Sequence, residues 1–550
     1  MSLLYKEFIN ETFNGKGEVV GFTAKELSDF NFAYDVIDRL AADKPDKLAM
    51  VWCNDEGREK FITFAELKRE SDRAASMLLG MGVNRGDTVM LILKRHYEFW
   101  FCFLGLCKIG AVAVPATNQL LEKDLIYRFN AASIKAVVCT ADGQIASMVD
   151  TAAAQCPTVQ AKVLIRGERD GWVCYENAMA AAGPFEKPVD LPKTSDIMLM
   201  YFSSGTTGMP KMVAHNYLYP LGHVPTAVYW QNVQPDGLHL TVSETGWAKS
   251  MWGKMYGQWL GETAIFVYDF DRFNAEEMLK RIAQYKVTTF CAPPTIYRFL
   301  IKQDLSRFDL SSLKYAVTAG EALNAEVYNQ FLKITGLKVK EGFGQTETTL
   351  LAGTFTWMEP KPGSMGKPSP QYDVHIVDDQ GHDVAPGEVG EITIHTDKRV
   401  PVGMMLGYYN DAELTANAWH DGLYHTGDTA WADEDGYIFY VGRVDDIIKS
   451  SGYRIGPFEV ESVIMEHPAV MECAVTGIPD PVRGQVVKAT VVLAKGFQAS
   501  DDLARELQEY VKTHTAPYKY PRAIEFVAEL PKTISGKIRR TEIRAKDAGK

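Results

Sequence analysis

The regular alternation of strand-like and helical patterns between residues 87 and 140 constrains the fold more than any other feature of the sequence. Three short runs rich in β-branched residues alternate there with two longer helical patterns. In chain order these segments cover residues 88–93, 97–109, 111–114, 121–130 and 135–139. A helix that crosses from one strand to the next makes those strands parallel. The sequence therefore predicts an α/β fold with a parallel sheet.

The chain is long enough for several structural units, since it has 550 residues and one unit spans about 150. Apolar residues at 46% and charged residues at 23% fit a folded globular protein, not a disordered chain or a coiled coil. From Asp373 to His395, short alternating strands with a Gly381 turn predict an antiparallel β subdomain. The pattern changes again near Val444, after which Pro457 opens a helix. We expect an N-terminal domain at 1–443 and a small α+β domain at 444–550.

Charge and cysteine usage exclude some classes of protein. The 58 Lys and Arg against 70 Asp and Glu give a formal net charge of −12, which argues against a nucleic-acid-binding or anionic-membrane surface. The eight cysteines are scattered, so we expect reduced thiols and no metal cluster. The N-terminus lacks the features of a secretory signal, and the longest apolar run, Phe99–Cys107, is too short to span a bilayer. We therefore expect a cytoplasmic protein.

The most informative motif follows an apolar strand at residues 197–202. It consists of small hydroxyl residues and glycines that end in a lysine: Ser203, Ser204, Gly205, Thr206, Thr207, Gly208 and Lys211. Such residues let backbone N–H groups approach phosphate oxygens, and the lysine adds a positive charge. The motif is not a Walker A loop, which requires Ser or Thr after the lysine, whereas Met212 stands here. A plain Gly/Ser turn would explain the glycines but not the whole run.

This run resembles the phosphate loop of the adenylate-forming superfamily, which includes acyl-CoA synthetases, luciferases and peptide-synthetase adenylation domains. Further matches follow in order over nearly the whole chain, at residues 320–322, 341–347, 424–428, 442–449 and 531–537. The resemblance implies a large N-terminal domain of parallel α/β sheets with a small antiparallel β subdomain at about 365–443. It also implies a small, mobile α+β C-terminal domain.

The resemblance assigns most of these segments to ATP. The predicted adenine and phosphate contacts are Gly320, Glu321, Ala322, Glu341, Gly342, Phe343, Gly344, Gln345, Thr346, Arg443, Arg454 and Lys537. Asp428 matches the ribose-binding turn, and a carboxylate can accept hydrogen bonds from both ribose hydroxyls. Glu347 is a hard oxygen ligand suited to Mg²⁺. Taken singly, Asp428 could be a turn residue and Glu347 a surface glutamate.

Catalysis needs cations, because attack of a carboxylate on the α-phosphate brings negative charges together. The catalytic candidates are Lys537, Arg454, Thr346 and Glu347. Without the resemblance, Lys537 would be read as part of a solvated basic face with Arg539, Arg540 and Arg544. Asp445 matches the hinge about which the family's C-terminal domain rotates between the two half-reactions.

The predicted contacts to coenzyme A lie in the C-terminal domain, in segments that look most like medium-chain acyl-CoA synthetases. They are Ser451, Gly452, Tyr453, Arg483, Lys512, Tyr520 and Arg522. Gly452 matches the glycine that lets pantetheine pass close to the backbone. Arg483, Lys512 and Arg522 could equally be exposed surface charges.

The predicted acyl pocket is formed by Trp247, Lys249, Trp252 and Gly344. Acetate-specific relatives close the pocket with a tryptophan at the position of Gly344, so the glycine favours a larger acyl group. Trp252 could shorten the cavity from another wall, although a buried tryptophan more often belongs to the core. Lys249 is unusual for an apolar site. We expect short to medium-chain acids, including branched ones, with small aromatic acids as the second choice.

The implied enzyme is an AMP-forming acid–thiol ligase of fatty acid metabolism that uses ATP, Mg²⁺ and coenzyme A. Three alternatives stay open: an adenylating enzyme with another acceptor, an NTPase that releases ADP, and a nucleotide-binding module without activity. We expect small-molecule partners and no nucleic acid. The sequence leaves the oligomeric state open, a homo-oligomer included.

Overall fold

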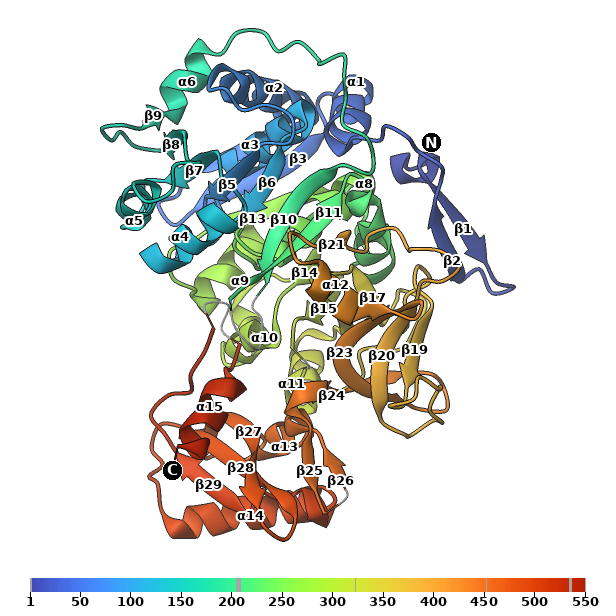
Figure 1. Ribbon diagram of the computed structural model, residues 1–550. Coiled ribbons are helices and arrows are strands. Elements are labelled where there is room, and N and C mark those ends of the chain that lie inside the picture. Colours follow the sequence, from blue (N-terminus) through green and yellow to red (C-terminus); the bar gives the residue numbers. More distant parts are fainter. Residues whose placement is uncertain (1, 204–208, 322, 452, 534–536, 550) are drawn as a thin grey trace.

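The structure is a computed structural model that describes residues 2–203, 209–321, 323–451, 453–533 and 537–549. Two large sheets form the N-terminal part of the molecule (Figure 1). A smaller antiparallel sheet lies beside them, and a separate C-terminal unit lies below them in this view. The calls on Ser204, Gly205, Thr206, Thr207, Gly208, Ala322 and Gly452 lie outside the described residues.

The first large sheet has eight strands and contains the predicted alternation. Its spatial order is β21 (Gly407–Tyr408), β11 (Lys211–Asn216), β10 (Ile197–Ser203), β6 (Val112–Pro115), β5 (Thr88–Ile92), β7 (Ala136–Thr140), β8 (Ala161–Ile165) and β9 (Val173–Cys174). The predicted strands β5, β6 and β7 pair in parallel, as expected. The predicted helices are α3 (Glu98–Ile109) and α4 (Glu122–Ala131). The edge strands β11 and β21 are antiparallel, so the sheet is mixed.

The second large sheet has nine strands. Its spatial order is β18 (Lys367–Pro368), β17 (Leu350–Gly353), β16 (Val339–Gly344), β15 (Tyr315–Ala319), β14 (Thr289–Cys291), β12 (Leu238–Thr241), β13 (Ala264–Asp269), β3 (Leu48–Asn54) and β4 (Glu59–Thr63). The helices α9 (Ala275–Gln284), α10 (Pro294–Leu300) and α11 (Ala325–Thr335) contribute to a core cluster with strands of this sheet. Both β15 and β16 end in segments that the sequence assigns to the nucleotide.

The N-terminal core is centred on α3, in which every residue is buried. It packs against α2 (Phe64–Gly80) at Gly105, where a Cβ atom would lie 2.9 Å from the backbone nitrogen of Ala75. Even Lys108 is fully buried, and its ammonium pairs with Asp38 at 2.7 Å and with Asp72. A buried ammonium needs such partners because its desolvation is costly.

The antiparallel subdomain is present as predicted. It consists of β19 (Val374–Val377), β20 (Gly390–His395), β22 (Trp419–His420), β23 (Leu423–Ala432) and β24 (Ile438–Arg443), with α12 (Ala412–Ala418). Gly381 lies in the turn after β19 and has the positive φ of +82° that favours glycine.

The C-terminal unit is a mixed sheet with its own core. Its elements are β25 (Ile448–Ser450), β26 (Tyr453–Ile455), α13 (Pro457–Ile464), β27 (Val470–Asp480), β28 (Gly484–Leu493), α14 (Asp501–His514), β29 (Ala523–Phe526) and α15 (Arg540–Ala548). Pro457 is the first residue of α13, as predicted. A single 3₁₀ turn at Val444–Asp446 leads from β24 into this unit. The boundary near Val444 and the mobility of the unit stay predictions.

Some elements had no prediction from the sequence. The strands β1 (Ile9–Phe13) and β2 (Val19–Ala24) form a separate hairpin, and two π-helical segments cover Phe32–Asp38 and Pro225–Trp230. Four short helices complete the N-terminal part: α1 (Arg39–Asp43), α6 (Tyr175–Ala181), α7 (Ala248–Gly253) and α8 (Tyr256–Leu260), with α5 (Ile145–Ala153) beside α4.

The expectation about the thiols is confirmed, since all eight cysteines are free and seven of them are buried. Among the described residues, no helix combines the length and the apolar character that crossing a membrane would require.

Candidate active site

Asp428 and Arg443 lie opposite each other on β23 and β24, the strands that adjoin the C-terminal unit. Their charged groups are 3.4 Å apart, and the guanidinium of Arg443 also donates to the carbonyl of Thr426 at 3.0 Å. The hydroxyl of Tyr440 donates to the other carboxylate oxygen of Asp428 at 3.1 Å. Burial raises the pKa of Asp428, and the positive charges of Arg443 and Lys537 oppose that rise.

Gln345 connects the end of β16 to this carboxylate. Its side-chain amide donates to Asp428 at 2.5 Å and to the carbonyl of Thr426 at 2.8 Å. The amide oxygen accepts a hydrogen bond from Tyr424 at 3.0 Å. The structure therefore brings together three predicted nucleotide residues, Gln345, Asp428 and Arg443, from separate motifs.

The ends of the phosphate loop are held together by β10 and β11, because Ser203 pairs with Lys211 in an antiparallel register. The ammonium of Lys211 lies 5.1 Å from the ring centre of Tyr408, whose hydroxyl donates to the carboxylate of Glu347 at 3.0 Å. The carbonyl of the neighbouring Thr346 accepts from the buried His215 at 2.7 Å. Lys211, which is predicted to bind phosphate, and the carboxylate of Glu347 thus flank one tyrosine.

The residues present fit the magnesium ion that the family implies. Glu347 offers a partly exposed carboxylate in the segment after β16, where it accepts a hydrogen bond from Tyr408. Mg²⁺ is usually held by one or two protein carboxylates together with waters and substrate phosphates. Glu347 would therefore hold the ion against a phosphate near Lys211, and the bound ion would neutralise negative charge there.

The predicted adenine loop follows β15. Gly320 has a φ of +105°, a value that side chains rarely tolerate. The carboxyl of Glu341 accepts from the backbone N–H of Leu323 at 2.9 Å, directly after the loop. Glu341 is buried, and burial raises its pKa to about 8. Glu321 is exposed and lies 3.9 Å from Arg298. Glu341 thus positions the loop instead of presenting its carboxyl to a ligand.

Lys537 is exposed, and its backbone exchanges two hydrogen bonds with Thr533 across the C-terminal loop, at 2.7 and 3.1 Å. Its positive charge acts on Asp428 and on Lys249, which both belong to the part of the molecule before the C-terminal unit. The neighbouring basic residues Arg540 and Arg544 are engaged with Glu461 and Asp446. Lys537 and its basic neighbours therefore do not form one uniformly solvated face, because Arg540 and Arg544 are paired with acidic residues.

The predicted acyl residues gather around α7. Trp247 is its N-cap and is partly exposed. The ring of Trp252 lies 6.1 Å from the buried ring of Trp230, and the ammonium of Lys249 lies 5.7 Å from the ring of Trp252. Burial lowers the pKa of Lys249, yet the residue keeps partial solvent exposure. Lys249 is therefore not part of the sealed core, because solvent still reaches it.

Gly342 and Gly344 lie on β16 next to this wall. A Cβ atom at Gly342 would lie 2.7 Å from the Trp230 ring, and one at Gly344 would lie 2.1 Å from the carbonyl oxygen of Thr349. The backbone at Gly344 therefore excludes any side chain, because a bulge shifts the register there.

The structure does not bring Arg454 to the nucleotide residues. Arg454 lies on β26, where it is exposed and pairs with Asp379 in the turn after β19. The reason is the hairpin of β25 and β26, which pairs Lys449 with Arg454 at the rim of the C-terminal unit. Its assignment to ATP and to catalysis stays a prediction.

The predicted coenzyme A contacts lie in two groups within the C-terminal unit. Lys512 and Arg522 both lie over the ring of Tyr520, at 4.6 and 4.8 Å. Tyr453 stacks on Tyr518 at 4.0 Å. The backbone carbonyl of Arg483 accepts from Ser451, which has a positive φ of 51°. In Figure 1, α14 lies at the end of this unit that faces away from the N-terminal sheets.

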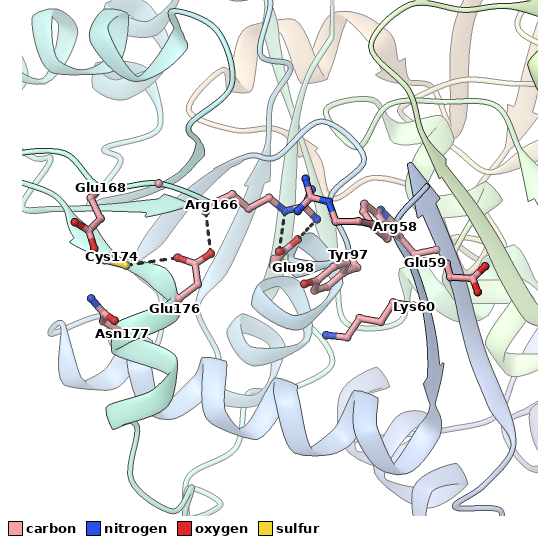
Figure 2. Close-up of a pocket in the computed structure, with 12 residues that line it drawn as sticks. Arg58, Glu59, Lys60, Tyr97, Glu98, Arg166, Glu168, Cys174, Glu176 and Asn177 are labelled. Carbon is pink, nitrogen blue, oxygen red and sulfur yellow. Dashed lines mark hydrogen bonds and ion pairs between the residues drawn. The ribbon is translucent and has the colours of Figure 1, made fainter. Parts of the chain in front are cut away.

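A cavity of about 710 Å³ lies elsewhere, between the edges of the two large sheets (Figure 2). Arg166 binds Glu98 at its centre with two hydrogen bonds of 2.9 and 3.0 Å and stacks on Trp52 and Tyr97. None of the predicted site residues lines this cavity. Its charges are mixed and largely paired, which indicates a structural junction of the sheets.

The sequence missed several residues of the site, chiefly Tyr408 and Tyr440. Tyr408 lies on β21, a strand of two residues at the sheet edge, which gives no local pattern. Tyr440 faces Asp428 because of a bulge between Thr429 and Ala430. Tyr424 and Thr426 lie inside the motif that contains Asp428. Because residues 424, 426 and 428 are two apart, their place on one face of a strand could have been predicted from the sequence.

The sequence pattern of the AMP-binding enzyme family matches residues 37–409, and that of the AMP-binding enzyme C-terminal domain matches residues 459–537. The two matched ranges cover most of the N-terminal part and much of the C-terminal unit, Lys537 included. The chain belongs to the AMP-binding enzyme family.

Two curated relatives align over nearly the whole chain. The acyl-coenzyme A synthetase ACSM3, mitochondrial, of Mus musculus is 40% identical over 561 residues, which cover 100% of this chain and 96% of the relative. The acyl-coenzyme A synthetase ACSM5, mitochondrial, of Homo sapiens is 42% identical over 531 residues, which cover 95% and 91%.

Two solved structures share the fold. The anthranilate CoA ligase AuaEII in complex with anthranoyl-AMP has a TM-score of 0.86 and 29% identity, covering 94% of this chain and 98% of the ligase. A benzoate CoA ligase from Burkholderia xenovorans has a TM-score of 0.80 and 27% identity, covering 94% and 100%. The predicted fold class is therefore confirmed.

Proposed function

We propose that this chain is an acyl-CoA synthetase that activates a short to medium-chain carboxylic acid, including branched acids, with ATP and transfers it to coenzyme A. The observation that carries the proposal is the hydrogen-bonded cluster of Asp428, Gln345 and Arg443, together with a charge on Lys537 that acts on Asp428. Asp428 is a buried carboxylate, and the charge of Lys537 reaches it from the C-terminal unit. Full-length similarity to two acyl-coenzyme A synthetases supports it.

The reaction has two steps. A carboxylate oxygen attacks the α-phosphorus of ATP, so that an acyl-adenylate forms and pyrophosphate leaves. The thiol of coenzyme A then loses its proton and attacks the acyl carbonyl, and AMP leaves. Asp428 would bind the ribose hydroxyls, Lys211 the phosphates and Lys537 the charge that develops on the α-phosphate. No protein nucleophile takes part, which suits the buried cysteines.

Lys249 and Lys537 are suited to hold the acid between them. Burial lowers the pKa of Lys249, and the like charge of Lys537 adds to that lowering. For Lys249, no salt bridge to an acidic side chain is found among the described residues. A carboxylate placed between the two ammonium groups would relieve the repulsion between these like charges. We infer that Lys249 orients the acid for attack on the nucleotide.

The acyl chain would extend from Lys249 toward Trp252, Trp230 and Gly344. Glycine at position 344 favours an acid larger than acetate by resemblance alone, because a Cβ atom here would point at the carbonyl oxygen of Thr349 and not at Trp252. Trp252 would limit the length of the chain. Small aromatic acids are the second candidate, because the two solved neighbours named above are an anthranilate and a benzoate CoA ligase.

Thioester formation would need another position of the C-terminal domain, which we place at residues 444–550. In the described arrangement the charge of Lys537 acts on Asp428, whereas the coenzyme A candidates Lys512 and Tyr520 belong to α14 and its neighbourhood. Rotation about Asp445 would move Lys537 away from Asp428 and bring the surface with Lys512 and Tyr520 toward the N-terminal domain. The arrangement seen here suits the adenylation step.

The cellular location and the pathway belong to the proposal as well. The curated relatives are named mitochondrial proteins, so they give no support to the expected cytoplasmic location. A role in fatty acid metabolism would follow from the acid that is activated. Coenzyme A, ATP and the acid are the proposed partners.

The test is release of AMP and pyrophosphate from MgATP and coenzyme A with acids from acetate to decanoate, including branched and aromatic members. We expect acid-dependent AMP and a thioester identified by mass, with the highest kcat/KM for a short or medium-chain acid. Accumulation of an acyl-adenylate that ignores coenzyme A would assign another acceptor. Release of ADP, or binding of ATP without turnover, would refute the proposal.

A further inference from the structure

We propose that Asp373, His375 and His395 form a binding site for a divalent transition metal of the Zn²⁺ type, on a solvent-exposed face of the antiparallel subdomain. This site is separate from the nucleotide residues and from Glu347. It would serve a function beyond the adenylation chemistry, since none of its three side chains contacts a residue of the candidate active site among the described contacts.

The register of β19 and β20 places the three side chains on one face. Val374 pairs with Ile394, and the backbone N–H of His395 donates to the carbonyl of Asp373 at 2.9 Å. Asp373 and His395 therefore lie opposite each other, and His375 is two residues along the same strand. Residues opposite each other or two apart on a strand share a face of the sheet. The three ligand atoms lie within 4.8 Å of one another.

His375 lies between two carboxylates. Its Nδ1 is 2.8 Å from Asp383, and its Nε2 is 3.2 Å from Asp373. An imidazole nitrogen without a proton is the form that binds a metal ion. With Nδ1 facing Asp383, Nε2 is the nitrogen of His375 that is placed to share a cation with the carboxylate of Asp373.

The distances match those of a tetrahedral metal ion. Bonds of about 2.0 to 2.2 Å to nitrogen and oxygen separate neighbouring ligand atoms by about 3.3 Å. Nε2 of His375 and the oxygen of Asp373 are 3.2 Å apart. The ring of His395 lies 4.1 Å from that of His375 between centres, so a small rotation supplies the third ligand.

The ligand set selects the metal. Two imidazoles and one carboxylate suit Zn²⁺ and its neighbours, whereas Mg²⁺ prefers oxygen ligands alone. Three protein ligands leave a fourth position for water. Asp383 would act on the metal through His375, since a carboxylate that accepts the other ring N–H fixes the orientation of a metal-bound histidine.

The surroundings provide a matched control. His420 and His425 also form a stacked surface pair on this subdomain, at 4.3 Å, and each has a carboxylate neighbour, Asp421 and Glu391. In the described part of the chain, however, only Asp373, His375 and His395 bring three such ligand atoms this close. Histidine content and exposure alone would predict binding at both places.

The experiment is titration of the full chain with Zn²⁺ by calorimetry, and with Co²⁺ by visible absorption, without ATP and in excess Mg²⁺ to occupy oxygen-ligand sites. We expect one equivalent bound per chain and a metal-dependent rise in Tm, because the site exists only in the folded state. His375→Ala should abolish both. Asp383→Asn should weaken binding about 10- to 100-fold, and His420→Ala should change neither.

The proposal is overturned if the wild-type protein binds no stoichiometric Zn²⁺ under these conditions. It is also overturned if His375→Ala binds as tightly as wild type, or if His420→Ala loses binding to the same extent. Acid-dependent AMP release by each apo variant shows that the variant is folded, and that readout is independent of the metal.

Discussion

The ammonium of Lys249 donates a hydrogen bond to the backbone carbonyl of Ala319 at 2.8 Å. Lys249 belongs to α7 in the predicted acyl wall, and Ala319 is the last residue of β15, directly before Gly320 of the predicted adenine loop. A single side chain therefore connects the two halves of the site. Lys249 can therefore bind the carboxylate of the acid while its hydrogen bond to Ala319 holds the end of β15 next to the predicted adenine loop.

Replacement of Lys249 should affect the acid more than ATP. Lys249→Met keeps the length of the side chain but removes the charge and the donor. We expect kcat/KM for the acid to fall about 10- to 150-fold, because a hydrogen bond to a charged group contributes about 1.5 to 3 kcal/mol and each 1.36 kcal/mol is a factor of about ten. The KM of ATP should change little. Steady-state kinetics with each substrate varied in turn would check this, and an equal loss for both substrates would assign Lys249 to the loop alone.

Trp252 should limit the length of the acyl chain. Trp252→Gly opens space beside Trp230, so we expect the acid with the highest kcat/KM to become longer by several carbons. The measurement is the acid panel with both proteins. Trp172→Gly removes a partly exposed tryptophan that packs near Lys162, away from the site, and serves as the control. An unchanged profile for Trp252→Gly would exclude it from the wall.

The sequence predicted those site residues that follow a regular element within a recognisable motif. Gln345, Asp428 and Arg443 were predicted because each belongs to a motif, whereas their meeting depends on the pairing of β23 with β24 and on the end of β16. Tyr408 escaped prediction because its strand has two residues and pairs with β11, which is almost two hundred positions earlier. Long-range pairing of so short a strand leaves no periodic pattern.

Arg454 illustrates a different limit. Its motif predicts a nucleotide contact, but its place depends on how the C-terminal unit is oriented. That orientation is set by contacts such as Arg454 with Asp379 and Asn324 with the carbonyl of Ser462. Local sequence determines the β25–β26 hairpin and not the surface on which it lies, so this part of the site could not be derived.

Lys537 should be needed for the first half-reaction. Lys537→Ala removes a charge that acts on Asp428 and Lys249, and we expect adenylation to slow about 100- to 1000-fold. Thioester formation from a supplied acyl-adenylate should be nearly unchanged. Lys532→Ala is the control, because Lys532 lies in the same loop but pairs with Glu472 at 2.7 Å. Equal loss in both half-reactions would argue for a structural role.

The hinge lies between residues that are attached to different parts of the molecule. Arg443 is bound to Asp428 and Thr426 on the antiparallel sheet, whereas Asp446 pairs with Arg540 and Arg544 of α15. Rotation between the two parts can keep both the contacts of Arg443 and those of Asp446 only if the backbone dihedral angles of Val444 and Asp445 change.

A proline at this pivot should separate the two half-reactions. Asp445→Pro fixes φ at the hinge and restricts Val444, so we expect thioester formation to slow at least about tenfold while adenylation continues. Asp445→Ala controls for loss of the carboxylate. Single-turnover measurements of each half-reaction give the answer, and a variant that loses adenylation as well would refute the hinge assignment.

The protein should lose stability as the pH rises, in part because of Glu341. Burial raises the pKa of this carboxyl from 4.5 to about 8 in the folded chain. The folded state then holds a proton that the unfolded state releases, so the contribution of this proton to stability is full below about pH 4.5 and is lost as the pH rises through 8.

Glu341→Gln keeps an acceptor for the N–H of Leu323 and removes the titration. We expect its Tm, relative to wild type, to rise by several degrees between pH 5 and pH 9. Calorimetry at one scan rate measures this, with the exposed Glu434→Gln as control. Parallel Tm curves for wild type and Glu341→Gln would show that the carboxyl is ionised in the folded protein throughout this range.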